Sequence, residues 1–160
     1  EFGLGPVGAE MCKRDRANEG EVDEAEPYVW GTARIRRSGG DVTIVTWSDC
    51  ANRAEAAADD LAADGISAEV IDLRSLWPWD RDAVLDSVGK TGRLLVAHES
   101  VAVGGFGAEV VASVVENTTL KAPPKRLGAP RALIPYAPNL EDQLRVTQDM
   151  IATAAKELCV

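Results

Sequence analysis

The stretch from Ser67 to Val110 constrains the fold more than any other part of the sequence. Two short runs, residues 68–73 and 93–98, are rich in aliphatic side chains and are typical of strands that helices cover on both faces. Between them, Asp80 can accept hydrogen bonds from the free amides of a helix over about residues 81–88. A strand–helix–strand series of this kind predicts parallel strands joined by right-handed crossovers.

The same patterns predict the remaining elements of the chain. They are a short strand within residues 29–37 that leads into a hairpin at 38–40, a strand over 42–47, a helix from Ser48 or Asp49 to about 63, a helix over about 106–116, a weaker strand over 125–129 and, after a proline-rich connection, a final helix from Gln143 or Thr147 to 158. The predicted fold class is α/β: a three-layer domain with a mostly parallel sheet of about five strands, over residues 29–160. Residues 1–28 are predicted to be a linker, a tag or a truncated end.

Composition and charge limit the function classes that are open to this chain. The 160 residues are 46% hydrophobic and carry a formal net charge of −9, enough apolar material for one domain with a core. An acidic balance without a basic stripe disfavours nucleic acid as a partner. No apolar run is long enough for a membrane span, and the first residues do not resemble a signal peptide. We therefore expect a cytoplasmic protein.

The titratable residues offer little for catalysis. The three cysteines, Cys12, Cys50 and Cys159, are widely spaced, which favours reduced structural thiols over disulfides or a zinc site. The only histidine is His98, so a Cys/His nucleophile pair stays open without a motif that supports it. We predict no metal ligands, since a metal site would need carboxylates alone beside His98.

His98 and Glu99 end a predicted strand, at the edge of the sheet where open α/β folds usually bind ligands. A glycine-rich turn follows them, formed by Gly104, Gly105, Phe106 and Gly107. This turn lacks the third glycine and the downstream acid of a dinucleotide fingerprint, so close packing is the simpler interpretation. We expect His98, Glu99 and the turn to serve subunit contact or packing.

Trp77 and Trp79 flank Pro78 in a loop at a strand end. Tryptophan side chains bury large areas and are enriched at interfaces. We expect another subunit to cover at least one of the two.

Three segments together carry a family resemblance: EVIDLRSLWPWD at 69–80, SVGKTGRLLVAHES at 87–100 and GGFGAEV at 104–110. They resemble the carboxyl-terminal domain of the transketolase superfamily, and more closely the beta subunit of thiamine-diphosphate-dependent 2-oxoacid dehydrogenases. The resemblance runs from about Gly31 to Leu158 and includes IPYAPNLED at 134–142. Its tryptophan–proline–tryptophan–aspartate variant leans towards the branched-chain (2-oxoisovalerate) type over the pyruvate or acetoin type.

The resemblance implies a supporting role and no catalytic residue in this chain. In such enzymes thiamine diphosphate and magnesium lie between two other domains, which carry a Gly-Asp-Gly motif and an activating glutamate. The parent reaction is oxidative decarboxylation of a 2-oxo acid, followed by acyl transfer to a lipoyl group. The implied partners are a second copy of the chain in a dimer, a diphosphate-binding alpha subunit and a lipoyl acyltransferase core. We expect the domain alone to bind no cofactor and to be inactive.

One motif departs from the family. Relatives commonly carry an acid in a Leu-acid-Ala-Pro motif that helps to dock the basic subunit-binding domain of the acyltransferase, whereas this chain has Lys121 there. A cation should repel that domain. Docking would then be weakened, or would use Asp142 and the last helix.

Two other functions remain open from the sequence. One is a stand-alone interaction module with the same fold. The other is an α/β domain that binds a nucleotide or another small ligand.

Overall fold

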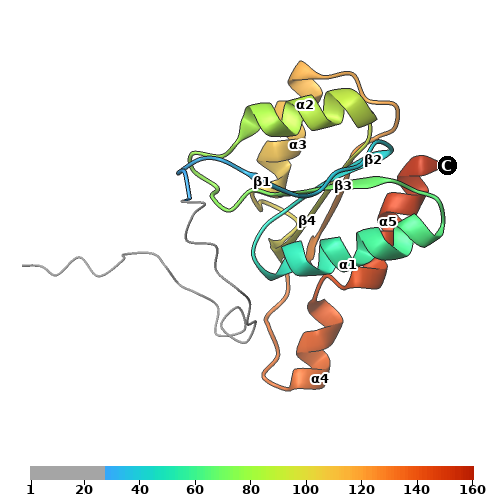
Figure 1. Ribbon diagram of the computed structural model, residues 1–160. Coiled ribbons are helices and arrows are strands. Elements are labelled where there is room, and N and C mark those ends of the chain that lie inside the picture. The colour runs from blue at the N-terminus through green and yellow to red at the C-terminus, as the bar shows by residue number, and fades with distance from the viewer. Residues whose placement is uncertain (1–27) are drawn as a thin grey trace, which may run out of the picture.

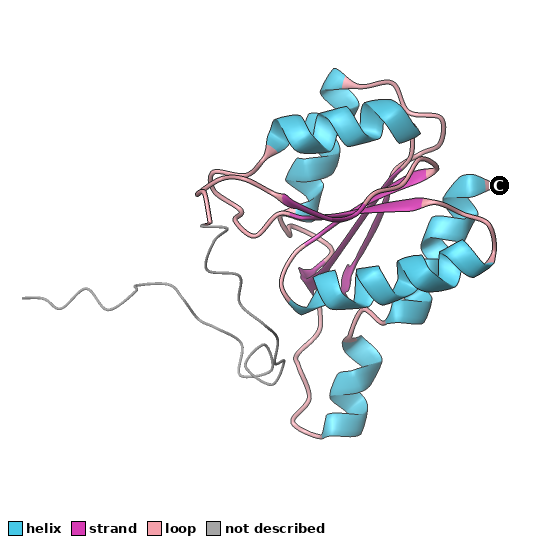
Figure 2. Cartoon of the chain, viewed as in Figure 1, coloured by secondary structure: helices cyan, strands magenta, loops and turns pink. Residues whose placement is uncertain are grey.

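The computed structural model describes residues 28–160, in which a five-stranded sheet lies between two layers of helices (Figures 1 and 2). The strands are β1 (Arg34–Arg37), β2 (Val42–Thr46), β3 (Ala68–Asp72), β4 (Leu94–Val101) and β5 (Lys125–Ala129), in the spatial order β1-β3-β2-β4-β5. Only β1 is antiparallel to its neighbour. The predicted three-layer α/β class with a mostly parallel sheet is confirmed. The segment predicted as a linker, residues 1–28, lies outside the described residues except for Tyr28.

The helices divide between the two faces of the sheet (Figure 1). They are α1 (Asp49–Ala63) and α5 (Gln148–Cys159) on one face, and α2 (Arg81–Thr91) and α3 (Gly107–Asn117) on the other. A short helix, α4 (Pro138–Glu141), continues into a 3-10 turn over Asp142–Leu144 and lies apart from these layers. Within the described residues, no helix is long and apolar enough to span a bilayer.

Strand β2 shows how the sequence pattern produces two cores. Successive side chains of a strand point to opposite faces, so Ile44 joins the core under α1 and α5 while Val45 joins the core under α2 and α3. All five residues of β2 are buried, as expected for a strand with a helical layer on each side. The β-branched run that predicted this strand is therefore explained by burial on both faces.

The predicted hairpin at residues 38–40 is wrong. Strand β1 does not pair with β2, which follows it, but with β3. Both edges of β2 are already occupied by β3 and β4, so β1 can only extend the sheet from outside. The glycine turn serves this crossing, because a Cβ on Gly39 would lie 2.2 Å from the backbone of Ala68.

Capping side chains and a left-handed glycine set several of the helix ends. The carboxylate of Asp80 accepts a hydrogen bond from the amide of Ala83 and caps α2 as predicted. At the other end of α2, Gly92 adopts φ +71°, a left-handed conformation that glycine tolerates. Ser48 stands at the start of α1, but its hydroxyl makes no capping hydrogen bond.

The chain after β5 contains more structure than predicted. The sequence indicated only a proline-rich connection there, whereas α4 and its 3-10 turn form before the last helix. Thr147 then caps α5, so the later of its two predicted starts holds. Pro138 sits at the first turn of α4, where its missing amide costs nothing.

Candidate functional site at the carboxyl edge of the sheet

An aromatic cluster covers the carboxyl edge of the central strands. Trp47 follows β2, and its ring stacks on His98 of β4 with centroids 4.9 Å apart and planes 13° from parallel. Phe106 meets Trp47 and Trp79 edge-on, each at a centroid distance of 6.0 Å. Such pairs add stabilisation beyond their buried area. The loops after β2, β3 and β4 are therefore held together by ring contacts.

His98 lies inside this cluster and is fully buried. Its Nδ1 lies 3.0 Å from the Ser100 carbonyl oxygen and 2.9 Å from the Ser100 hydroxyl oxygen. Burial lowers the pKa of the imidazole, the hydrogen bond to the Ser100 carbonyl raises it, and the nearby charge of Arg126 lowers it further. The net direction is downward, so the ring is neutral near pH 7 and packs as a flat, uncharged side chain.

The glycine-rich turn packs against the same imidazole. A Cβ on Gly107 would lie 2.5 Å from His98 Nε2, and a Cβ on Gly105 would lie 3.0 Å from His98 Cε1. Gly104 has φ +80°, a conformation that L side chains rarely adopt. The glycines at 105 and 107 thus allow close approach of the turn to the histidine.

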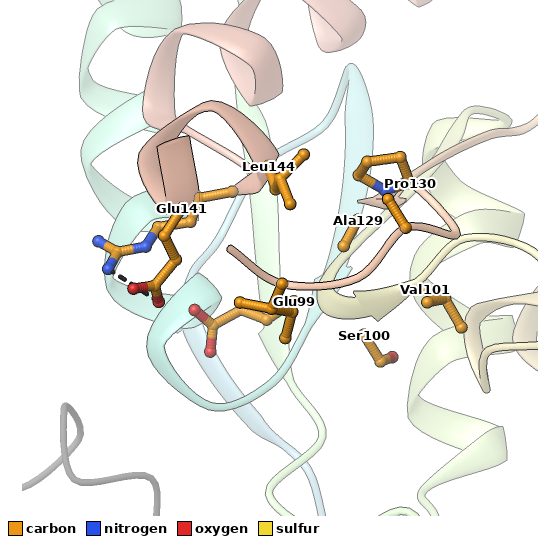
Figure 3. A pocket seen from close by; sticks show the side chains of 10 residues that line it. Glu99, Ser100, Val101, Ala129, Pro130, Glu141 and Leu144 are labelled. Atoms are coloured by element: carbon orange, nitrogen blue, oxygen red, sulfur yellow. Dashed lines mark hydrogen bonds and ion pairs between the residues drawn. The ribbon is translucent and has the colours of Figure 1, made fainter. Parts of the chain in front are cut away.

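The side chain of Glu99 points away from β4, towards α1 and the α4 segment (Figure 3). Arg53 of α1 lies 3.4 Å from Glu99, pairs also with Asp49 and donates to the carbonyl oxygen of Val146 at 2.7 Å. One guanidinium thereby joins α1, β4 and the chain before α5.

A pocket of about 330 Å³ opens beside Glu99, between the ends of β4 and β5 and the α4 segment (Figure 3). Its walls are mostly aliphatic, and its polar side chains are Glu99, Ser100, Glu141 and Arg145. Arg145 pairs with Glu141 at 3.3 Å and with Asp142 at 2.9 Å, which fixes one wall. The remaining lining residues are Val101, Ala129, Pro130, Ala132, Ile134 and Leu144.

The two tryptophans around Pro78 have different environments. Trp79 is partly buried against Phe106, whereas Trp77 is 81% exposed. The exposed Trp30 lies at the same edge of the sheet, since it precedes the start of β1, which pairs with the end of β3. Of the predicted pair, Trp77 is the side chain free to meet a partner.

The structure separates the two residues predicted for acyltransferase docking. The Lys121 ammonium donates to the carbonyl oxygen of Thr91 at 3.0 Å, next to Gly92 and the start of β4. Asp142 pairs with Arg145, and Arg145 lines the pocket at the carboxyl end of β4. The length of β4, roughly 23 Å at about 3.3 Å per residue, lies between them. They cannot form one compact docking site.

The pocket beside Glu99 is a poor match for thiamine diphosphate. The pocket presents the carboxylates of Glu99 and Glu141, which would repel a diphosphate. Within residues 28–160, no group of three or more histidine, cysteine, aspartate or glutamate side chains could hold a metal ion. The sequence also has no Gly-Asp-Gly motif.

Sequence reasoning missed the stacking of Trp47 on His98, and it missed Arg53, Glu141 and Arg145. The stack of Trp47 on His98 had a usable signal, because parallel pairing of β2 with β4 places Thr46 beside Ala97 and hence the next residues side by side. The pocket had no usable signal in the sequence. One of its walls is formed by α4, and a helix of four residues is too short to leave a periodic pattern.

Comparison with known proteins places these features in context. A family model described as "Transketolase, C-terminal domain" matches residues 31–151. The 2-oxoisovalerate dehydrogenase subunit beta of Bacillus subtilis is 39% identical over 148 residues, which are 89% of this chain and 45% of that protein. The mitochondrial pyruvate dehydrogenase E1 component subunit beta-2 of Oryza sativa subsp. japonica is 46% identical over 131 residues, 81% of this chain and 35% of its own. This chain thus spans less than half of either relative.

A solved structure agrees with the fold. The chain titled "Split gene transketolase, inactive beta4 tetramer" superposes with a TM-score of 0.76 at 27% sequence identity. The match covers 86% of this chain and 45% of that one.

Proposed function

Because the chain belongs to the transketolase C-terminal domain family, we propose that it is the carboxyl-terminal domain of a 2-oxoacid dehydrogenase beta subunit. One observation carries the proposal: beta subunits of the 2-oxoisovalerate and pyruvate enzymes match most of this chain with only part of their own length. The reaction of the whole enzyme is oxidative decarboxylation of a 2-oxo acid with acyl transfer to lipoyl. Thiamine diphosphate and magnesium supply the chemistry from outside this domain.

The domain's own task is assembly. Its carboxyl edge carries large apolar side chains in water, among them Trp30, Trp77 and the loop residues Leu133, Ile134 and Tyr136. Exposed apolar groups gathered at one edge are typical of surfaces that a partner covers. The partners we propose are a second copy, the diphosphate-binding alpha subunit and the lipoyl acyltransferase core. The solved neighbour, a beta4 tetramer by its title, supports the self-association.

A chimera tests the proposal. Residues 31–159 would replace the matched segment of the Bacillus subtilis 2-oxoisovalerate dehydrogenase beta subunit, which would be co-produced with its own alpha subunit. We expect a thiamine-dependent decarboxylase with 2-oxoisovalerate or pyruvate, whereas the beta subunit truncated before this segment should be inactive. A folded chimera that assembles with the alpha subunit but decarboxylates neither acid would contradict the proposal.

A matched variant separates assembly from folding. Trp77→Ser in the chimera removes an exposed side chain, so the fold should persist while assembly weakens. If the Trp77→Ser chimera assembles as well as the original chimera, Trp77 is not part of the contact surface.

A further inference from the structure

The pocket beside Glu99 has the size of a site for a small molecule. Its volume is about 330 Å³, and ligand pockets of proteins usually measure about 300–1,000 Å³. A dry cavity of about 150 Å³ already holds a benzene-sized group. The pocket therefore has room for a branched aliphatic group and for a polar head beside it.

Aliphatic side chains form most of the wall of this pocket. Val101 ends β4, Ile134 belongs to the loop after β5, and Leu144 belongs to the 3-10 turn after α4. Among the described residues, no aromatic side chain lines the pocket. A flat ring would therefore find no stacking partner there, whereas a branched aliphatic group is removed from water by groups of its own kind.

Polar groups of both signs share one side of the pocket. Figure 3 shows the carboxylates of Glu99 and Glu141 on one side and the side chains of Val101 and Pro130 on the other. The guanidinium of Arg145 lies 3.3 Å from Glu141 and so belongs to the polar side. A head group with a single charge would meet a like charge in this wall, whereas a zwitterion offers each sign its complement.

One donor in the polar wall has no acceptor. The two Nη atoms of Arg145 pair with Glu141 and Asp142. Its Nε is buried and has no hydrogen-bond partner in the part of the chain that the structure describes. Buried donors without an acceptor are rare and costly. A ligand carboxylate would supply the missing acceptor, and its hydrogen bond to a guanidinium belongs to the strong class.

The two glutamates can accept a ligand ammonium without giving up their present partners. Glu99 pairs with Arg53, and Glu141 pairs with Arg145. An ionised carboxylate has about four acceptor positions on its two oxygens. Additional hydrogen bonds from an ammonium are therefore compatible with the ion pairs that these side chains already make.

We propose that this pocket binds a free aliphatic α-amino acid of the size of valine or leucine. The ligand carboxylate meets Nε of Arg145, and the ammonium donates to the side that holds Glu99 and Glu141. The branched side chain packs on Val101 and Ile134. This binding site goes beyond the assembly role proposed above and does not rest on it.

Titration of the 160-residue chain with L-leucine tests the site. Amide chemical shifts in NMR spectra give dissociation constants in the millimolar range, and we expect a saturable constant of about 1 mM or below. Two analogues each lack one head group: 4-methylpentanoate has no ammonium and 3-methylbutylamine has no carboxylate. Both should bind at least about tenfold more weakly than leucine. Leucine and valine that do not saturate the chain, or an analogue that binds as tightly as leucine, would overturn the proposal.

A bulky side chain in the loop after β5 locates the bound ligand. Ile134 lines the pocket but is 76% exposed, so Ile134→Trp should fill the pocket and leave the fold intact. We expect it to weaken leucine binding about tenfold or more. Leu133→Trp is the matched control, because Leu133 is 96% exposed and does not line the pocket. It should change the dissociation constant less than about twofold. Equal effects of the two substitutions would move the ligand out of the pocket.

The guanidinium has its own test. Arg145→Lys keeps the positive charge but removes Nε and the planar fork, so leucine binding should weaken about tenfold. Arg131→Lys makes the same exchange at an exposed position that does not line the pocket, and it should change nothing. An unchanged affinity in Arg145→Lys would show that Arg145 does not hold the ligand carboxylate.

The outcome is separable from that of the proposed function. Leucine binding is measured on the chain alone, whereas decarboxylation is measured on the chimera. The 2-oxo acid 4-methyl-2-oxopentanoate lacks the ammonium, so it should bind the chain as weakly as 4-methylpentanoate. Binding of this 2-oxo acid more tightly than leucine would make the pocket a site for the enzyme's substrate and would reject the amino-acid site.

Discussion

At the scale of single residues, His98 makes the stability of the domain depend on pH. Its pKa in the folded chain is lowered from the ordinary value of 6.5, chiefly by burial. The unfolded chain therefore binds the proton more tightly, and the contribution to stability is complete above about pH 6.5 and is lost as the pH falls towards the folded pKa. We expect urea unfolding between about pH 7.5 and 5 to show a loss of at most about 1.4 kcal/mol per pH unit.

A variant without an imidazole isolates this effect. His98 is the only histidine, so His98→Gln should lower stability at every pH but flatten its dependence in that window. An equal slope in the variant would assign the titration to another group.

Two helix glycines should respond to alanine in opposite directions. A Cβ on Gly107 would press on His98 at 2.5 Å and on Val96 at 3.2 Å, so Gly107→Ala should cost about 1–3 kcal/mol in unfolding free energy. Gly89 lies within α2 with nothing within 4 Å of its Cβ position, so Gly89→Ala should gain about 0.5–1 kcal/mol. Thermal melts of both variants would check this. A stabilising alanine at 107 would mean that the His98 ring can move aside.

At the scale of elements, Asp80 ties one helix to a distant strand entry. One carboxylate oxygen caps α2 at the Ala83 amide, and the other accepts from the Ala33 amide at 2.8 Å, just before β1. Asp80→Ala should therefore cost more than an ordinary cap, about 2–3 kcal/mol in urea unfolding. Asp82→Ala, in the same first turn but exposed, should cost only about a few tenths of a kcal/mol. Equal losses would show that Asp80 acts through the helix dipole alone.

The elements also show what local sequence can and cannot predict. Strand β2 and helix α2 were predictable because burial on both faces and an aspartate cap leave marks within a few residues. The partner of β1 was not, since it depends on which edges of β2 are occupied. The pocket was equally hidden, because β4 continues past His98 and α4 forms in a proline-rich segment, and only their approach creates it.

At the scale of the whole molecule, the two edges of the sheet carry different features. The carboxyl edge holds the aromatic cluster, the pocket and the exposed loop with Leu133 and Tyr136. The amino edge holds Lys121, whose chain packs on Gly92 and whose ammonium donates to the last turn of α2. A cation at a helix carboxyl end is stabilising. The lysine that departs from the family motif therefore has a structural partner within the domain.

This arrangement makes opposite predictions for stability and docking when Lys121 becomes an acid. Lys121→Glu removes the hydrogen bond to Thr91 and places negative charge at the end of α2, so unfolding free energy should fall by about 1–2 kcal/mol. The resemblance implies that an acid here helps to dock the basic subunit-binding domain of the acyltransferase, so affinity for that domain should rise about tenfold. Asp142→Ala, whose carboxylate pairs with Arg145 at the other edge of the sheet, should change that affinity little. Calorimetric titration of both variants decides the matter, because a loss of affinity confined to Asp142→Ala would move docking to the carboxyl edge of the sheet.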